Sequence, residues 1–260
     1  MDSKPPGLER LQAEDPLTKV LIMADVHLRH DEELHPTYKL VKEFAADWQP
    51  DIVVDLGDWL DLNYLSSFDK DKLRNLESRR LRGDYDLAHR ELDYWQTLAR
   101  LVKLEGNHDE RIERWIDAVP ALEGVVEYET EFEFTKRGID WHRYRDGQPV
   151  KLGKLNMMHG YYHGKYPAAK HLDVYMGSVI FGDVHRFQVF SRGVPNYADE
   201  IQAWSIGCLC GLQPEYAKGR PMGWQNGFAV MYLHDSGDFN MYPINIIRDT
   251  FVFEGHTWGE

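Results

Sequence analysis

The stretch KVLIMADVH at residues 19–27 decides the fold of the N-terminal half of the chain. Its apolar run is typical of a buried β-strand, and it closes with two polar residues, Asp25 and His27. A helical pattern covers residues 36–49, and DIVVDLGD at residues 51–58 is then a second buried strand that ends in charge. A strand, a helix and a strand in this order predict a β-α-β unit, with parallel strands in a sheet covered by helices.

The rest of the chain extends this pattern and then changes it. RLVKLEGNHDE at residues 100–110 predicts a third strand that runs into a turn. Over residues 128–144, and less cleanly over 151–160, apolar and polar residues alternate, which favours antiparallel strands. SVIFGDVH at residues 178–185 predicts another buried strand, and residues 228–247 predict a hairpin.

Length and composition predict a globular protein. With 260 residues, of which 43% are hydrophobic and 13% aromatic, the chain can bury a sizeable core. No apolar run approaches the roughly 20 residues that span a bilayer, and the N-terminus does not resemble a signal peptide. We therefore expect a soluble, cytoplasmic protein without a membrane partner. Residues 1–17 predict a flexible lead-in, and residues 62–100 predict a charged helical insert.

Net charge and cysteine content exclude some classes of function. A net charge of −13 does not favour a basic face for duplex DNA, and bound divalent cations would neutralise part of it. The two cysteines, Cys208 and Cys210, are too close in sequence for good disulfide geometry, and no distant pair could complete a thiolate zinc site. We interpret both as small, half-buried residues of a turn, which fits a reducing compartment.

Residues that can bind metal ions or carry protons follow five of the apolar runs. They are Asp25 with His27, Asp58, Asn107 with His108 and Asp109, His159, and Asp183 with His185. The carboxyl ends of strands are where an α/β sheet binds ligands, and side chains at i and i+2 point to one side. Each motif alone has an ordinary explanation as a turn or cap, but their joint order is hard to obtain by chance. The tripeptide Asp-Val-His occurs twice, but the residues around its two copies do not align, so a duplicated domain is not indicated.

The series ADVH, LGDW, EGNHDE, MHG and GDVHR resembles the motifs of the calcineurin-like metallophosphoesterase superfamily. That family's pattern is DxH, GDxx, GNHD/E, an isolated His followed by Gly, and GHxH. The resemblance extends from about residue 19 to residue 230 and is strongest to phage-type members. It implies an α/β fold, a four-layer α/β/β/α sandwich of two mixed β-sheets, with a metal site at the carboxyl ends of the strands. Residues 18–260 would form this single domain.

The resemblance also implies two divalent metal ions. Site one would consist of Asp25, His27, Asp58 and His185, and site two of Asp58, Asn107, His159 and Asp183. Asp183 stands where the family has His, either naturally or as an introduced substitution, and it makes site two harder and more anionic. Mn²⁺ is therefore favoured, with Mg²⁺, Fe, Ni²⁺ and Zn²⁺ as alternatives.

Catalytic roles follow from the same resemblance. Two ions about 3.5–4 Å apart would neutralise phosphate oxygens and hold a bridging hydroxide that attacks phosphorus. His108 would be the general acid for the leaving alkoxide, and Asp109 would orient its ring. Arg186 and His163 are candidates for substrate binding, although a solvent-facing arginine and a surface histidine explain them equally well or better.

A group of arginines in the predicted insert has two explanations. The group is Arg74, Arg79, Arg80 and Arg82. It could follow a phosphate backbone, but the interleaved acidic residues favour an ordinary solvated helix.

The function expected from these observations is a metal-dependent phosphoric ester hydrolase, with a phosphodiesterase favoured. A phosphomonoesterase and a nuclease of the same superfamily are alternatives, and the net charge does not favour a nucleic-acid substrate. A third alternative is a non-catalytic interaction scaffold on the same fold. If the gene belongs to a phage, the host cytoplasm is the expected location. The natural substrate and the oligomeric state do not follow from the sequence.

Overall fold

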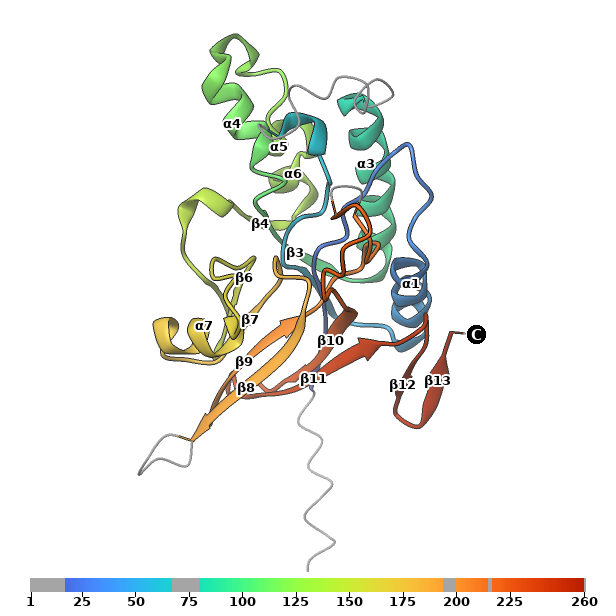
Figure 1. The fold of residues 1–260 in the computed structure, drawn as a ribbon, viewed down its shortest axis with the longest axis vertical. Coiled ribbons are helices and arrows are strands. Elements are labelled where there is room, and N and C mark those ends of the chain that lie inside the picture. The colour runs from blue at the N-terminus through green and yellow to red at the C-terminus, as the bar shows by residue number, and fades with distance from the viewer. Residues whose placement is uncertain (1–16, 67–79, 194–199, 215–216, 260) are drawn as a thin grey trace, which may run out of the picture.

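The computed structural model describes residues 17–66, 80–193, 200–214 and 217–259 (Figure 1). The predicted lead-in therefore lies outside the described residues, apart from its last residue, and so do Arg74 and Arg79. None of the helices in the described part of the chain combines the length and the apolar character needed to span a bilayer.

The first sheet contains the predicted β-α-β unit. Its strands are β1 (Thr18–Met23), β2 (Ile52–Asp55), β3 (Arg100–Leu104), β4 (Asp140–His142), β10 (Asn226–Leu233) and β11 (Phe239–Ile246), in the order β11-β10-β1-β2-β3-β4. The strands from β1 to β4 are parallel, with Ile22 beside Val54 and Val54 beside Val102. β10 and β11 are antiparallel and form the predicted hairpin.

The second sheet is built from the C-terminal half. Its strands are β5 (Val150–Leu152), β6 (Leu155–Met158), β7 (Val179–Phe181), β8 (Phe187–Gly193) and β9 (Glu200–Ile206), in the order β5-β6-β7-β9-β8. β6, β7 and β9 are parallel, whereas β5 and β8 are antiparallel to their neighbours. Both sheets are therefore mixed, as the family resemblance implied.

The helices complete the outer layers. They are α1 (Pro36–Trp48), α3 (Leu81–Leu98), α4 (Arg111–Ala118), α5 (Tyr128–Phe132), α6 (Phe134–Arg137) and α7 (Pro167–Tyr175), with 3₁₀ turns η2 (Asn63–Leu65), η3 (Pro120–Leu122) and η4 (Tyr144–Asp146). A hairpin of β12 (Phe251–Phe253) and β13 (His256–Trp258) follows the first sheet. Figure 1 shows α1 and α3 on the side of the first sheet and α7 on the side of the second.

Alternation along the strands produces the four layers. Ile22 and Val54 share one buried core with Met157 and Ile180 of the second sheet, so the two sheets pack face to face. Residues one position away point to the opposite face, where Leu21 shares a core with the side chains of α1 and α3. The far side of the second sheet packs against α7. The α/β/β/α sandwich implied by the family resemblance is confirmed.

The prediction of antiparallel strands over residues 128–144 is wrong for most of that stretch. Residues 128–137 form α5 and α6, and only Asp140–His142 is a strand, which pairs in parallel with β3. Tyr128, Phe132 and Phe134 are fully buried. Tyr128 and Phe132 are four residues apart, a spacing that puts both on one helix face. A short alternating pattern therefore suited both structures, and packing against the core selected the helices.

Candidate metal centre

The loops after β1, β2 and β3 hold one another through their backbones. The amide of Asp25 donates to the carbonyl of Gly57 at 3.0 Å, and the amide of His27 donates to the carbonyl of Asp58 at 3.0 Å. Gly57 has a φ of 108°, and a Cβ there would lie 2.5 Å from the backbone nitrogen of Gly106. Asp25, His27 and Asp58 all have positive φ values. Such left-handed backbone costs free energy in non-glycine residues, and it concentrates at functional sites.

The four residues predicted for site one lie together. Asp25 Oδ1 is 3.1 Å from His185 Nε2, and the Nε2 atoms of His27 and His185 are 3.2 Å apart. Asp58 Oδ2 is 3.6 Å from His27 Nε2. Asp25, Asp58 and His185 are buried. Two histidines and two carboxylates thus direct their polar atoms at one point.

The residues predicted for site two also converge. Asp58 Oδ1 is 3.3 Å from His159 Nε2, the Asn107 amide is 3.0 Å from the same nitrogen, and Asp183 Oδ1 is 3.7 Å from it. His159 Nδ1 donates to the carbonyl of Leu56 at 3.0 Å, which directs Nε2 toward the other three residues. Histidines that bind metals are commonly held through their second nitrogen in this way.

Asp58 lies between the two sites. One of its carboxylate oxygens faces His27 of site one and the other faces His159 of site two. A carboxylate that is buried and shared in this way has the geometry needed to bridge two cations.

The carboxylates and histidines of the site shift one another's pKa values. Burial by itself would lower the pKa of His159, but the nearby Asp58 outweighs it and raises that pKa to about 10. Asp25 likewise holds the pKa of His185 well above its usual value in spite of burial. Burial alone would raise the pKa of Asp58, yet the imidazoles of His159 and His108 keep it well below the usual range. The buried carboxylates and imidazoles of the site therefore favour one another's charged forms.

A divalent cation would likewise favour the charged carboxylates, and the donor set fits one. Among the described residues, three groups of three side chains have ligand atoms within 4.8 Å of one another: Asp25, Asp58 and His159; His27, Asp58 and His108; and His27, His185 and Cys210. Ligands about 2.1 Å from an octahedral ion lie about 3 Å apart. The separations cited for the two sites are 3.0–3.7 Å, with 4.0 Å between Asp25 Oδ1 and His27 Nε2, and most are close to that value.

His108 lies beside the centre, and Asp61 contacts it. The ring nitrogen Nδ1 of His108 donates to the carbonyl of Asp61 at 2.6 Å, and Nε2 is 3.9 Å from Asp58 Oδ2. Asp61 Oδ1 also lies 3.4 Å from His27 Nδ1 and 3.6 Å from His108 Nδ1. Arg111 donates to the same carbonyl at 2.8 Å. The sequence contained a signal for Asp61, a second acid three residues after Asp58, that our interpretation missed.

Asp109 is placed differently from the expectation that it would orient His108. Its carboxylate accepts hydrogen bonds from the amides of Trp59, Leu60 and Gly106 and from the hydroxyl of Tyr128, at 2.8–3.2 Å. The side chain is fully buried. Asp109 thus joins the loops after β2 and β3, because these unpaired amides need an acceptor. The contact with His108 Nδ1 is made by Asp61 instead.

The two residues predicted to bind substrate, Arg186 and His163, both contact other residues of the protein. Arg186 donates to the carbonyls of His163 and Gly164 at 3.0 and 2.8 Å, so it holds the loop after His159. The His163 ring is 67% exposed and lies 2.9 Å from Asp183 Oδ2. His163 therefore borders site two at the surface.

Arg82, in the predicted insert, lies on an ordinary solvent-exposed helix surface. Arg82 of α3 pairs with Asp86 at 2.9 Å and with Glu131 at 2.7 Å, and both contacts are solvent-exposed.

A cavity lies on the site-one side of the centre. Its volume is about 110 Å³, and it is lined by His27, Arg29, Glu33, His35 and Cys210 among others. Its floor includes the centre's own His27, so a group bound there would adjoin site one. No sequence motif indicated this cavity, because its walls come from two distant segments of the chain.

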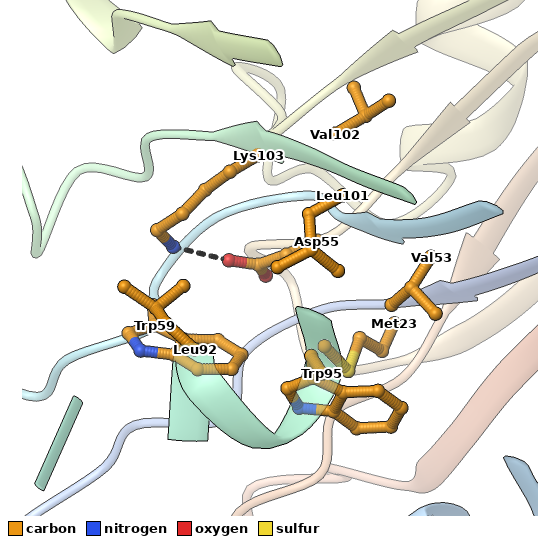
Figure 2. Close-up of a pocket in the computed structure, with 9 residues that line it drawn as sticks. All are labelled: Met23, Val53, Asp55, Trp59, Leu92, Trp95, Leu101, Val102 and Lys103. Carbon is orange, nitrogen blue, oxygen red and sulfur yellow. Dashed lines mark hydrogen bonds and ion pairs between the residues drawn. The ribbon is translucent and has the colours of Figure 1, made fainter. Parts of the chain in front are cut away.

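A buried ion pair between Lys103 and Asp55 lies at the end of β2, just before the turn that carries Asp58 (Figure 2). Lys103 Nζ lies 2.5 Å from Asp55 Oδ2, and the Asp55 Oδ1 atom accepts the amide of Gly57 at 3.1 Å. Figure 2 shows the pair between the end of β2 and the indole of Trp59, beside a small apolar cavity. The pair therefore fixes the turn that presents Asp58.

The chain is similar to a known protein family and to several known proteins. The model of the calcineurin-like phosphoesterase family matches residues 18–187. The gene 54 proteins of Mycobacterium phages D29 and L5 are 25% and 24% identical to the chain, and each alignment covers 92% of this chain and 98% of the relative. Among solved structures, a Vps29 single mutant from Entamoeba histolytica matches with a TM-score of 0.42 and 15% identity, covering 92% of this chain and 95% of the other.

Proposed function

Because the chain belongs to the calcineurin-like phosphoesterase family, we propose that it is a dinuclear-metal phosphodiesterase. The observation that carries this proposal is the position of Asp58, whose two oxygens face histidines of two separate sites. The ligands we assign are those predicted for the two sites, Asp25, His27, Asp58 and His185, and Asp58, Asn107, His159 and Asp183.

When bound, two divalent ions would neutralise the phosphate oxygens and lower the pKa of a bound water molecule. The chain's own residues would do the rest. His159 and Asn107 would hold one ion, and Asp25 with His185 would hold the other. His108 would donate the proton to the leaving oxygen from Nε2, because its Nδ1 is held by the Asp61 carbonyl. The Asp61 carboxylate, 3.6 Å from Nδ1, would stabilise the charged ring.

The hydrogen bonds that two arginines make within the protein support a phosphodiester rather than a phosphomonoester as the substrate. A phosphate monoester is a dianion and needs additional positive charge in its pocket. Arg186 donates to two backbone carbonyls, and Arg111 donates to the Asp61 carbonyl and to the Asn63 side chain. The cavity beside His27 gives space for one substituent of a diester.

Oxygen donors support manganese or magnesium in site two. Asp58, Asn107 and Asp183 would each offer an oxygen there, and His159 alone offers nitrogen. Such donor sets suit Mn²⁺ and Mg²⁺.

Hydrolysis of two model substrates tests the proposal. With Mn²⁺ supplied, we expect the protein to cleave bis-p-nitrophenyl phosphate with a higher kcat/KM than p-nitrophenyl phosphate. An Asp58→Ala variant should cleave neither, and a variant of the exposed Arg82 to Ala should behave as the wild type. Preference for the monoester would favour the phosphomonoesterase alternative. Failure to cleave any ester with metals present would favour the interaction scaffold.

A further inference from the structure

The Cys-Leu-Cys turn, residues 208–210, lies against site one. It follows β9, and both cysteines are free thiols. Cys210 Sγ lies 3.9 Å from His185 Nδ1, and Cys210 lines the cavity that also contains His27. The turn predicted from the sequence is present, but its position beside a metal site was not predicted.

Hydrogen bonds fix this turn to the centre itself. The Asn226 side chain donates to the carbonyl of Cys208 at 3.1 Å and to that of Cys210 at 2.8 Å. The amide of Leu209 donates to the carbonyl of Asp25 at 3.2 Å. The backbone of the turn is therefore held by the buried Asn226 side chain and by a site-one residue.

The sulfur lies 3.9 Å from Nδ1 of His185, whereas Nε2 of the same ring faces His27 and Asp25, so an ion at Nε2 reaches the sulfur only after rotation of the Cys210 side chain. One ring nitrogen of His27, one of His185 and the Cys210 sulfur all lie within 4.8 Å of one another. In a tetrahedral site with metal–sulfur and metal–nitrogen distances of about 2.3 and 2.0 Å, sulfur and nitrogen are about 3.6 Å apart. Separations of up to 4.8 Å would therefore have to shorten by as much as about 1.2 Å around an ion, an adjustment within the range of side-chain rotation.

We propose that Cys210 supplies a thiolate ligand to the ion in site one, which gives that site a preference for thiophilic metals such as Zn²⁺ or Fe²⁺. The inference rests on the proposed dinuclear centre and deepens it. On binding, a sulfur–metal bond forms and the thiol proton passes to solvent. Site two, with three oxygen donors, keeps its preference for Mn²⁺ or Mg²⁺, so the two sites would hold different metals when both kinds are supplied.

Cys208 provides a matched control in the same turn. Its sulfur contacts the carbonyl of Gln225 at 3.6 Å and the side-chain amide of Asn226 at 3.8 Å, it also interacts with His185, and it is fully buried. A Cys208→Ser variant keeps a donor for that carbonyl and leaves Cys210 in place.

Cobalt spectroscopy tests the inference without relying on activity. Co²⁺ is titrated into the metal-free full-length protein, and its visible d–d bands report binding by any ligands. A sulfur-to-cobalt charge-transfer band in the near ultraviolet reports a bound thiolate. We expect both features in the wild type and in Cys208→Ser, and only the visible bands in Cys210→Ser. Zn²⁺ affinity should fall at least about tenfold in Cys210→Ser, with a smaller change for Mn²⁺.

The outcomes separate this inference from the proposed function. Visible bands without a charge-transfer band in the wild type would overturn the sulfur ligand and leave the metal centre standing. The sulfur ligand is also overturned if Cys210→Ser keeps the band or if Cys208→Ser loses it. Absence of visible bands in the wild type would overturn the metal centre itself, and the sulfur ligand with it. Because the wild-type spectrum can decide against the inference alone, the test does not depend on the folding of Cys210→Ser.

Discussion

Replacement of Lys103 by Met should destabilise the protein through the carboxylate that it leaves behind. Lys103 and Asp55 are 2% and 4% exposed, so neither charge reaches solvent. Their contact of 2.5 Å compensates both. Met keeps the unbranched stem of Lys103 near the Trp59 ring but removes the ammonium group, which leaves a buried carboxylate without its cation.

The expected magnitude is large on the scale of protein stability. Breaking a buried pair by removing one partner costs about 3–5 kcal/mol, which is a substantial part of the 5–15 kcal/mol that typically stabilises a domain. Asp55 Oδ1 also accepts the amide of Gly57. The double variant Asp55→Asn, Lys103→Met keeps that acceptor and removes the charge, so it should recover more than half of the loss.

The pH dependence gives a second check on the same variant. Burial raises the pKa of Asp55 even with Lys103 nearby, and loss of Lys103 should raise it further. A carboxyl group whose pKa is higher in the folded than in the unfolded state binds protons preferentially when folded. The unfolding free energy of Lys103→Met should therefore fall, relative to the wild type, as the pH rises from about 4.

Urea unfolding of the metal-free proteins, followed by far-ultraviolet circular dichroism and by tryptophan fluorescence, measures these free energies. A loss below about 1 kcal/mol in Lys103→Met would refute the reasoning. A double variant no more stable than the single one would refute it as well.

Three further predictions concern other parts of the molecule. His108→Ala should retain metal binding by calorimetry but lose far more turnover with alkyl than with activated aryl esters, and an equal loss with both would remove its role as the acid. Asp183→His should change the metal stoichiometry or preference measured by mass spectrometry, and an unchanged metal content would show that Asp183 does not bind the second ion. Burial lowers the pKa of His171 to about 4, and its neutral ring accepts the Tyr161 amide at 3.2 Å. The unfolded chain takes up this proton below about pH 6.5, so the wild type should lose about 3 kcal/mol of stability by pH 4, whereas His171→Gln should show a shallower decline in the same titration.

The part of the site that the sequence predicted comes from residues at strand ends. Asp25, Asp58 and Asn107 follow the apolar runs of β1, β2 and β3, and the parallel strands of one sheet bring their carboxyl ends to one edge. Their convergence was therefore predictable from order and spacing alone. The packing of the two sheets followed from the same motifs through the family resemblance.

The rest depends on contacts between distant segments. Asp109 was expected at His108 but satisfies three backbone amides instead, a demand that exists only after the loops have met. Cys210 is placed beside His185 by Asn226 and by the Asp25 carbonyl, neither of which is near it in sequence. A sequence pattern therefore indicates which chemistry a side chain can perform, whereas its contacts with distant segments are known only from the folded structure.

The most direct test of the dinuclear centre is the rate of bis-p-nitrophenyl phosphate hydrolysis while Mn²⁺ is titrated into the metal-free protein. We predict no turnover without metal, a rise in rate that levels off at two ions per chain, and loss of activity on chelation. A rate that is independent of Mn²⁺, or full activity at one ion per chain, would contradict a catalytic centre in which Asp58 bridges two metals.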